Sequence, residues 1–523
     1  MKKFILALLI ATLSCSFVGC GQDDEYEQYG DKEEIRATVY WGEFGYQWLK
    51  DIANEWNENT DSNYYIKVTG DSYLASSIIS HLKSGSSYDL YVCSDSGFQT
   101  VFNTGLLEDL SDLLPKSPDN NGVTVADKLP SYKTWRNLAG GNEKMYMLPY
   151  AISPTGLIFD YQKFYDNGWL MLDEDGTVAA GKDGIKGTYD DGQPTTWAEF
   201  DKLIQKINMT TNEVFCYMGA TNPEYVNNVA YAYLAQYLGE EGYQAFLKHD
   251  TAGKEVKMSD GSMRAFDITE GYLTTEMDGM KQMLSFVKNY FLNSSYVANK
   301  ALTDSSYGVD ASHTSFINGD AAYILEGNWW ENGARSLIES YQSFGGYAYG
   351  EGDYRYLLLP AIDGQATESH KSVYFSQSGG SLVVPYSKDR DKIAAIKDFL
   401  LFLLKNDNLK KVTIDTGLIW NYKYEIEGES KNQLTKFMQN TMALKNDPNV
   451  SIHSFFLDCA SQPIYAYSSL DTTALFRGKN GQLYVPVMLR NDSVDTVYGQ
   501  IQEFMSGKWS GYLQTVQSYG FYK

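Results

Sequence analysis

The sequence has little positive charge and no long apolar run. Its 523 residues carry 43 lysines and arginines against 66 aspartates and glutamates, which gives a formal net charge of −23. A nucleic-acid-binding protein needs a basic surface to displace counterions from phosphates, so we expect no nucleic-acid partner. Beyond the N-terminus, no segment approaches the roughly 20 consecutive apolar residues that a membrane-spanning helix requires. A hydrophobic share of 43% nevertheless supports a folded core and excludes wholesale disorder.

Residues and motifs that carry chemistry are also scarce. The chain has 5 cysteines and 5 histidines without metal-ligand spacing, so we expect buried thiols at Cys93, Cys216 and Cys459 and histidines at the surface. The G-x-S-x-G nucleophile elbow, the P-loop, the HExxH zinc motif and the CxxC pair are absent. Paired carboxylates are uninformative, because 66 acidic residues place some pair about 5–10 Å apart in any fold. We therefore expect neither catalysis nor a cofactor.

Aromatic residues are abundant: the chain holds 42 tyrosines, 24 phenylalanines and 10 tryptophans. A buried phenol must find a hydrogen-bond partner, so a core alone does not account for this many tyrosines. The C–H faces of sugars stack on such rings, while sugar hydroxyls pair with carboxylates and amides. The aromatic surplus therefore favours a carbohydrate ligand.

The N-terminus has the pattern of a secretion signal. Two lysines precede an apolar run over Phe4–Leu13, which ends before Gly19 and Cys20. This ending resembles the lipobox of bacterial lipoproteins, although Phe17 departs from the usual leucine, and an ordinary signal peptide remains the alternative. The resemblance implies a signal peptide over 1–19, a lipid anchor on Cys20 and a flexible tether over 20–36, on the extracellular face of the cell membrane.

From Ile35 onward the pattern is that of an α/β protein. Short apolar strands alternate with helical stripes, which predicts mostly parallel sheets covered on both faces. Thr196 and Glu199 form a capping box that predicts a helix start. Further helices are expected over 392–404 and 493–504. Because we find no repeat and no low-complexity linker, two lobes with chain crossings between them fit best.

An Asp- and Gly-rich passage over 173–192 interrupts this pattern. Carboxylates interleaved with turn glycines suit calcium, and Asp183, Asp190 and Asp191 are the candidate ligands. The spacing of an EF-hand is not met, however. A solvated insertion whose aspartates form turns is the alternative.

Aromatic and acidic residues gather where strands are expected to end. Trp41 and Glu43 follow the first strand, Asp95 follows the third, and Trp329 and Trp330 follow a later one. In open α/β sheets the carboxyl ends of the strands line the ligand crevice. We therefore expect these side chains to contact a ligand.

Several short segments, in this order, resemble the extracellular solute-binding proteins of carbohydrate ABC importers. Each segment is degenerate alone, but their order and spacing over most of the chain are specific. They are Val39–Glu43, Leu82–Gly85, Gly105–Leu110, Leu148–Tyr150, Leu157–Asp160, Pro194–Phe200, Phe316–Ala322, Gly327–Trp329 and Ser378–Pro385.

The resemblance implies a periplasmic-binding-protein-like fold of two lobes, with a ligand in the cleft between them and no bond made or broken. The expected N-lobe is 37–152 plus about 377–430, and the C-lobe is 153–376 plus about 431–523. The resemblance also implies that lobe closure around an oligosaccharide lets the protein, expected to be a monomer, dock on its ABC permease.

The resemblance also suggests roles for particular residues. Trp329 matches a stacking tryptophan, while Glu43, Asp95 and Asn222 match polar cleft positions. Ser153 stands where relatives present a carboxylate in the first crossing. Additional cleft walls are expected at Tyr73, Trp330, Trp420 and Trp41. Alternatives left open are a peptide or polyamine ligand, a surface glycoside hydrolase, and a binding protein that signals to a sensor kinase.

Overall fold

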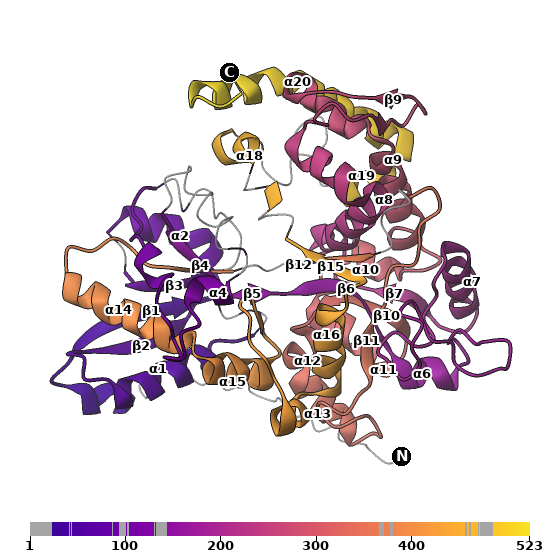
Figure 1. Ribbon diagram of the computed structural model, residues 1–523. Helices are drawn as coiled ribbons and strands as arrows, with labels where there is room; N and C mark the ends of the chain where they lie inside the picture. Colours follow the sequence, from indigo (N-terminus) through magenta and orange to yellow (C-terminus); the bar gives the residue numbers. More distant parts are fainter. Residues whose placement is uncertain are drawn as a thin grey trace, which may run out of the picture.

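The computed structural model describes residues 24–40, 42, 44–85, 87–93, 101, 104–129, 131, 144–365, 371–376, 380–454, 458–459, 462–468, 470 and 485–522. The chain folds into two lobes, each built around its own sheet (Figure 1). Among the described residues, no helix is both long and apolar enough to cross a bilayer.

The N-lobe is built on a five-stranded sheet with the order β2-β1-β3-β13-β4. Its strands are β1 (Glu33–Val39), β2 (Tyr64–Gly70), β3 (Leu90–Cys93), β4 (Met147–Pro149) and β13 (Ser381–Val383). Helices of the same lobe are α1 (Gln47–Asn59), α2 (Leu74–Lys83), η2 (Ser111–Leu113), α4 (Val125–Lys128), α14 (Arg390–Leu403) and α15 (Asn406–Thr416). Apolar residues at helical spacing explain α1, which buries Trp48, Ile52 and Trp56.

Regular structure is present within the segment that the sequence predicted as a tether. Residues 24–36, expected to belong to a tether, form the 3-10 helix η1 (Asp24–Tyr29) and the first half of β1. Tyr26 is buried and its ring stacks on Tyr65 of β2, 5.7 Å between centroids. The absence of aliphatic residues suggested a solvated segment, but aromatic packing supplies the burial instead.

The C-lobe contains a six-stranded sheet with the order β15-β12-β6-β10-β7, in which β11 also pairs with β6. Its strands are β6 (Pro154–Asp160), β7 (Glu213–Cys216), β10 (Ala321–Gly327), β11 (Tyr354–Tyr356), β12 (Ser372–Ser376) and β15 (Val450–His453). A small hairpin pairs β8 (Val256–Lys257) with β9 (Met263–Arg264). Every residue of β6 and β10 is buried, as expected for strands covered on both faces.

Helices cover both faces of the C-lobe sheet (Figure 1). The capping box predicted at Thr196 and Glu199 is present at the start of α7. The predicted helix over 493–504 is longer in the structure and extends to Ser518. The helices are α6 (Tyr161–Asp166), α7 (Trp197–Asn208), η3 (Pro223–Val226), α8 (Asn227–Lys248), η4 (Ile268–Glu276), α9 (Asp278–Phe286), η5 (Val287–Phe291), α10 (Asn299–Thr303), α11 (Val309–Asn318), α12 (Trp330–Gly333), α13 (Arg335–Gln342), α16 (Lys436–Asn446), α18 (Pro463–Tyr467), α19 (Val485–Asn491) and α20 (Val494–Ser518).

The described elements place three crossings between the lobes. In the first, β4 leads through β5 (Ala151–Ile152) into β6, and the second leads from β12 to β13. The third crossing, residues 417–435, contains β14 (Ile419–Trp420) and η6 (Gly428–Gln433) and ends at α16. Because β14 pairs antiparallel with β5, the first and third crossings form one two-stranded hinge ribbon.

The prediction of mostly parallel sheets is wrong, because both main sheets are mixed and contain antiparallel pairs beside parallel ones. β1 runs parallel to β2 and β3, while β13 runs antiparallel to β3. In the C-lobe, β6 is antiparallel to β10, β11 and β12. A strand that has just crossed from the other lobe starts at the hinge edge, where its neighbours end, and therefore runs against them.

All three cysteines of the described chain, Cys93, Cys216 and Cys459, are buried, as predicted. The histidines differ from the prediction, since His249 and His313 are buried too. His249 Nδ1 lies 3.0 Å from the carbonyl oxygen of Gly271, and its Nε2 lies 2.8 Å from the hydroxyl of Tyr465. A neutral imidazole that donates from Nδ1 and accepts at Nε2 fits this site. The prediction of a surface position is wrong for His249, because Gly271 and Tyr465 provide the hydrogen bonds that water would otherwise make.

Burial of His249 predicts an acid-sensitive fold. Burial lowers the pKa of its imidazole to about 4, whereas the unfolded chain binds this proton below about pH 6.5. The stabilising contribution is therefore full above pH 6.5 and falls by about 3 kcal/mol as pH drops toward 4. Urea unfolding between pH 4 and 8 measures it. The variant His249→Gln should be less stable at pH 8 and lose less stability on acidification; equal pH slopes for both proteins would contradict the prediction.

Candidate ligand-binding site

Three strands of the C-lobe meet at one edge beside the hinge. β6 begins there, and β10 and β12 end there: Gly327 and Phe375 both pair with Thr155, and Ser376 pairs with Pro154. The residues that continue these strands toward the hinge therefore lie together. The edge brings Ser153 and Trp329 into one neighbourhood.

Trp329 follows β10 directly and its position depends on Gly327. A Cβ atom at Gly327 would lie 2.1 Å from the Trp329 ring, so the ring packs against the bare α-carbon of that glycine. The Trp329 residue is 6% exposed to solvent. The sequence predicted this residue as the stacking ring, and the structure places it at the hinge edge of the C-lobe.

Asn222 lies in the loop between β7 and η3, and η3 is tied to the same edge. The hydroxyl of Tyr225 in η3 donates to Glu326 Oε2 at 2.9 Å, and Glu326 immediately precedes Gly327. The Oδ1 atom of Asn222 is buried and has no hydrogen-bond partner among the described residues. A buried acceptor without a partner costs free energy, so this oxygen atom is suited to accept a hydrogen bond from a ligand.

Ser153 has the same property. It lies between β5 and β6, and its backbone N–H donates to Ser376 Oγ at 2.8 Å. Its own Oγ is buried and has no hydrogen-bond partner within the described part of the chain. Two of the sequence-predicted polar positions therefore carry unsatisfied oxygen atoms near the hinge.

The side chains of Trp330 and Trp420, both predicted as cleft walls, are fully buried in this structure. Of the two, Trp420 also lines the larger cavity between the lobes. Trp330 packs edge-on against Tyr354 at 4.8 Å and Phe316 at 5.3 Å. The Trp420 indole N–H donates to the carbonyl oxygen of Leu409 at 3.0 Å. Both rings fill core volume, a role that sequence pattern does not separate from ligand stacking.

Tyr73 is 75% exposed at the start of α2 and follows β2. This places it just after the carboxyl end of an N-lobe strand, with most of its side chain exposed. Trp41, Glu43 and Asp95, the other N-lobe positions predicted from the sequence, lie outside the described residues.

The calcium alternative is not supported. Asp190 Oδ2 accepts backbone N–H groups of Lys182 and Asp183 at 2.7 and 3.0 Å. Asp191 accepts from the backbone N–H of Gly187, and Asp183 from that of Ile185. These carboxylates close turns of the insertion. Across the described part of the chain, no group of three His, Cys, Asp or Glu residues is arranged to hold a metal ion.

One buried acid–base pair lies near the strand edge. His313 Nε2 is 3.4 Å from Glu326 Oε1, and both side chains are almost completely buried. A general acid or base must reach the proton it transfers. Because these groups are enclosed in the C-lobe, they are suited to holding β10 and α11 together rather than to acting on a substrate.

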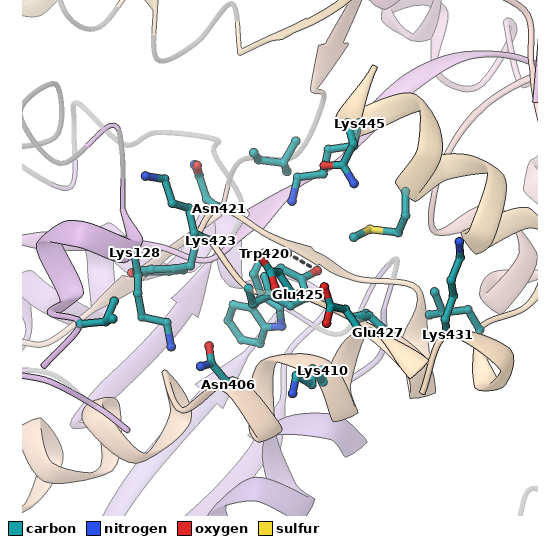
Figure 2. Close-up of a pocket in the computed structure, with 18 of the residues that line it drawn as sticks. Lys128, Asn406, Lys410, Trp420, Asn421, Lys423, Glu425, Glu427, Lys431 and Lys445 are labelled. Carbon is teal, nitrogen blue, oxygen red and sulfur yellow. Dashed lines mark hydrogen bonds between the residues drawn. The ribbon is translucent and has the colours of Figure 1, made fainter. Parts of the chain in front are cut away.

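Two cavities lie between the lobes. The larger, about 990 Å³, is lined by the third crossing together with α4, α15 and α16 (Figure 2). Figure 2 shows Lys445 and Lys410 on opposite sides of Trp420. Burial lowers the pKa of Lys445 to about 8, and its ammonium group lies 5.2 Å from the centre of the Tyr424 ring.

The smaller inter-lobe cavity, about 670 Å³, joins the start of α1 to α12 and α13. Phe44 and Trp48 contribute from the N-lobe, and Asn332, Arg335 and Tyr349 from the C-lobe. Its mixture of aromatic and hydrogen-bonding groups suits a polar ligand with apolar faces, and its volume is that of small-molecule sites, about 300–1,000 Å³.

Sequence reasoning missed Asn328 and Glu331, which flank the two tryptophans. Their side chains form hydrogen bonds with Gly417 and Thr435 at the two ends of the third crossing. Burial raises the pKa of Glu331 to about 7. Polar residues on both sides of the aromatic pair were visible in the sequence, but their partners lie about a hundred residues away.

The chain is similar to known proteins in sequence family and in fold. The family model for bacterial extracellular solute-binding proteins matches residues 51–425. No curated protein matches the chain by sequence.

Three solved structures share the fold at low sequence identity. The cyclic α-maltosyl-1,6-maltose binding protein of Arthrobacter globiformis is 14% identical with a TM-score of 0.56, and the match covers 92% of this chain and all of that one. RafE of Streptococcus pneumoniae is 13% identical with a TM-score of 0.55, over 91% of this chain and 98% of that one. A chitin oligosaccharide binding protein is 13% identical with a TM-score of 0.59, over 93% of this chain and all of that one.

Proposed function

We propose that this chain, which belongs to the family of bacterial extracellular solute-binding proteins, binds an oligosaccharide between its lobes. It then delivers the sugar to an ABC import permease without breaking a bond in it. The observation that carries the proposal is the position of Trp329 at the hinge edge of a two-lobed fold. Similar structures that bind maltosyl-maltose and chitin oligosaccharide support a sugar as the ligand.

The binding chemistry follows from the strand edge. A sugar ring stacks its C–H face on Trp329, while its hydroxyl groups pair with oxygen atoms that the protein leaves unsatisfied. Ser153 Oγ and Asn222 Oδ1 are two such atoms. Each gains a hydrogen bond only when the ligand is bound, which removes the cost of a buried unpaired group.

Delivery depends on the hinge. The expected N-lobe (37–152 plus about 377–430) and C-lobe (153–376 plus about 431–523) close around the ligand by bending at the crossings. The permease then distinguishes the loaded, closed protein from the free one. In this proposal the protein acts as a monomer.

We also propose that Cys20 carries a lipid that holds the protein on the extracellular face of the membrane. The lipobox-like residues before Cys20 support this proposal, and two acyl chains suffice for stable anchoring. The mass of the N-terminal peptide of the mature protein tests it: a diacylglycerol-modified Cys20 is expected, and an unmodified N-terminus at another residue would refute it.

Calorimetric titration with a panel of solutes tests the proposed ligand class. The panel contains malto-, chito- and raffinose-type oligosaccharides, short peptides and polyamines. At least one oligosaccharide is expected to bind with 1:1 stoichiometry and to be recovered intact. Binding of a peptide or polyamine alone would replace the sugar proposal, and new reducing ends appearing over time would identify a hydrolase.

A further inference from the structure

The four-residue loop segment Asn328–Glu331 comprises the two residues after β10 and the first two residues of α12, and it contacts both ends of the third crossing. The crossing leaves the N-lobe at Gly417 and reaches the C-lobe at Thr435. The loop segment belongs to the C-lobe, because it continues β10 and begins α12. One side chain of the loop reaches each end of the crossing.

At the N-lobe end, the contact is a buried hydrogen bond. Asn328 Nδ2 donates to the carbonyl oxygen of Gly417 at 2.7 Å, and Asn328 is 1% exposed. Gly417 has φ +78, and a Cβ there would lie 3.3 Å from the carbonyl oxygen of Asn328 and 3.2 Å from Met438 Sδ. The glycine therefore permits both the left-handed turn that ends α15 and the close approach of the loop.

At the C-lobe end, the hydroxyl of Thr435 donates to Glu331 Oε2 at 2.5 Å. Thr435 also caps α16, because its Oγ1 accepts the backbone N–H of Met438 at 3.1 Å. Glu331 is 2% exposed. This hydrogen bond connects Glu331 to the first turn of α16.

From these two contacts we infer that Asn328 and Glu331 are positioning residues that couple the ring of Trp329 to the third crossing. The inference rests on the proposed function, in which Trp329 contacts the ligand. When a bound sugar displaces the loop, both ends of the crossing move with it. Because coupling between two sites is reciprocal, the arrangement of the lobes also determines the position of the Trp329 ring.

The two contacts determine which side chains can replace Asn328 and Glu331. Gly417 presents an acceptor, so position 328 must supply a donor; Asn328→Asp and Asn328→Ala both remove it. Thr435 presents a donor, so position 331 must supply an acceptor. Glu331→Met removes the acceptor at similar volume, whereas Glu331→Gln keeps one and serves as the matched control.

Hydrogen exchange of the unliganded full chain tests the coupling without any sugar. The backbone N–H groups of Asn421 and Lys423 are bonded to the carbonyl oxygens of Tyr150 and Lys128. Asn328→Asp and Asn328→Ala should raise their exchange rates about tenfold or more, the upper part of the range that coupling energies give. Glu331→Met should raise the exchange of Lys436 and Met438 similarly. Glu331→Gln should stay within about threefold of the parent.

The second measurement is the affinity for the tightest oligosaccharide of the panel. The donor-less and acceptor-less variants should bind about 5- to 100-fold more weakly, with Glu331→Gln close to the parent. Unchanged exchange at the crossing would overturn the inference, as would faster exchange throughout the C-lobe, which signifies a purely structural role. If no sugar binds the parent protein, the proposed function fails while the exchange data still decide whether the loop holds the crossing.

Discussion

Replacing Trp329 by alanine is expected to weaken oligosaccharide binding by about 30-fold or more. The ring lies at the hinge edge of the C-lobe sheet in a residue that is 6% exposed, and central aromatic anchors cost about 2 kcal/mol or more when truncated. At about 1.4 kcal/mol per tenfold change, that loss corresponds to the stated factor. Calorimetry is the suitable measurement, because the substitution also removes a fluorophore.

The conservative variant Trp329→Phe is the matched control. It retains a flat ring against the α-carbon of Gly327, so its affinity should stay within about tenfold of the parent. Far-ultraviolet circular dichroism should be the same for all three proteins. Parent-like affinity of Trp329→Ala would show that the ring does not stack on the ligand.

Replacing Trp330 by alanine is expected to destabilise the protein, by about 3–5 kcal/mol. The side chain is fully buried between α11, β11 and α16, with rings of Phe316, Tyr354 and Phe437 within about 6 Å. Its removal leaves a large cavity that these neighbours only partly fill. The free energy of unfolding in urea measures the loss.

The two neighbouring tryptophans are therefore expected to differ in their effect on binding. Trp330→Ala should lower the urea midpoint while the protein that remains folded keeps its affinity for the ligand, whereas Trp329→Ala should lose affinity. A loss of stability below about 1 kcal/mol for Trp330→Ala would contradict the packing described here.

The alternation of strands and helices and the hydrophobic periodicity were enough to predict the fold class. The capping box at Thr196 and the strand–loop sequence around Gly327 were predicted at their correct places, because local hydrogen bonding and periodicity determine them. The direction of β6 and β13 was not predictable in this way. It depends on where the chain crosses between lobes, which is a property of the whole fold.

The candidate site was predictable only in part. Trp329 and Trp330 are adjacent in sequence and identical in type, and both are buried, but they pack in two different core clusters. Burial is decided by neighbours such as Phe437, more than a hundred residues away. The contacts of Asn328 and Glu331 were missed for the same reason, since their partners Gly417 and Thr435 lie 89 and 104 residues further along the chain.

Small-angle X-ray scattering tests the central claim, that an oligosaccharide binds between the lobes and closes them. The protein is measured free and saturated with the tightest oligosaccharide of the panel, with Trp329→Ala at the same sugar concentration as control. We predict a smaller radius of gyration for the saturated parent protein and no change for the variant. A saturated parent protein with an unchanged scattering curve would contradict the account.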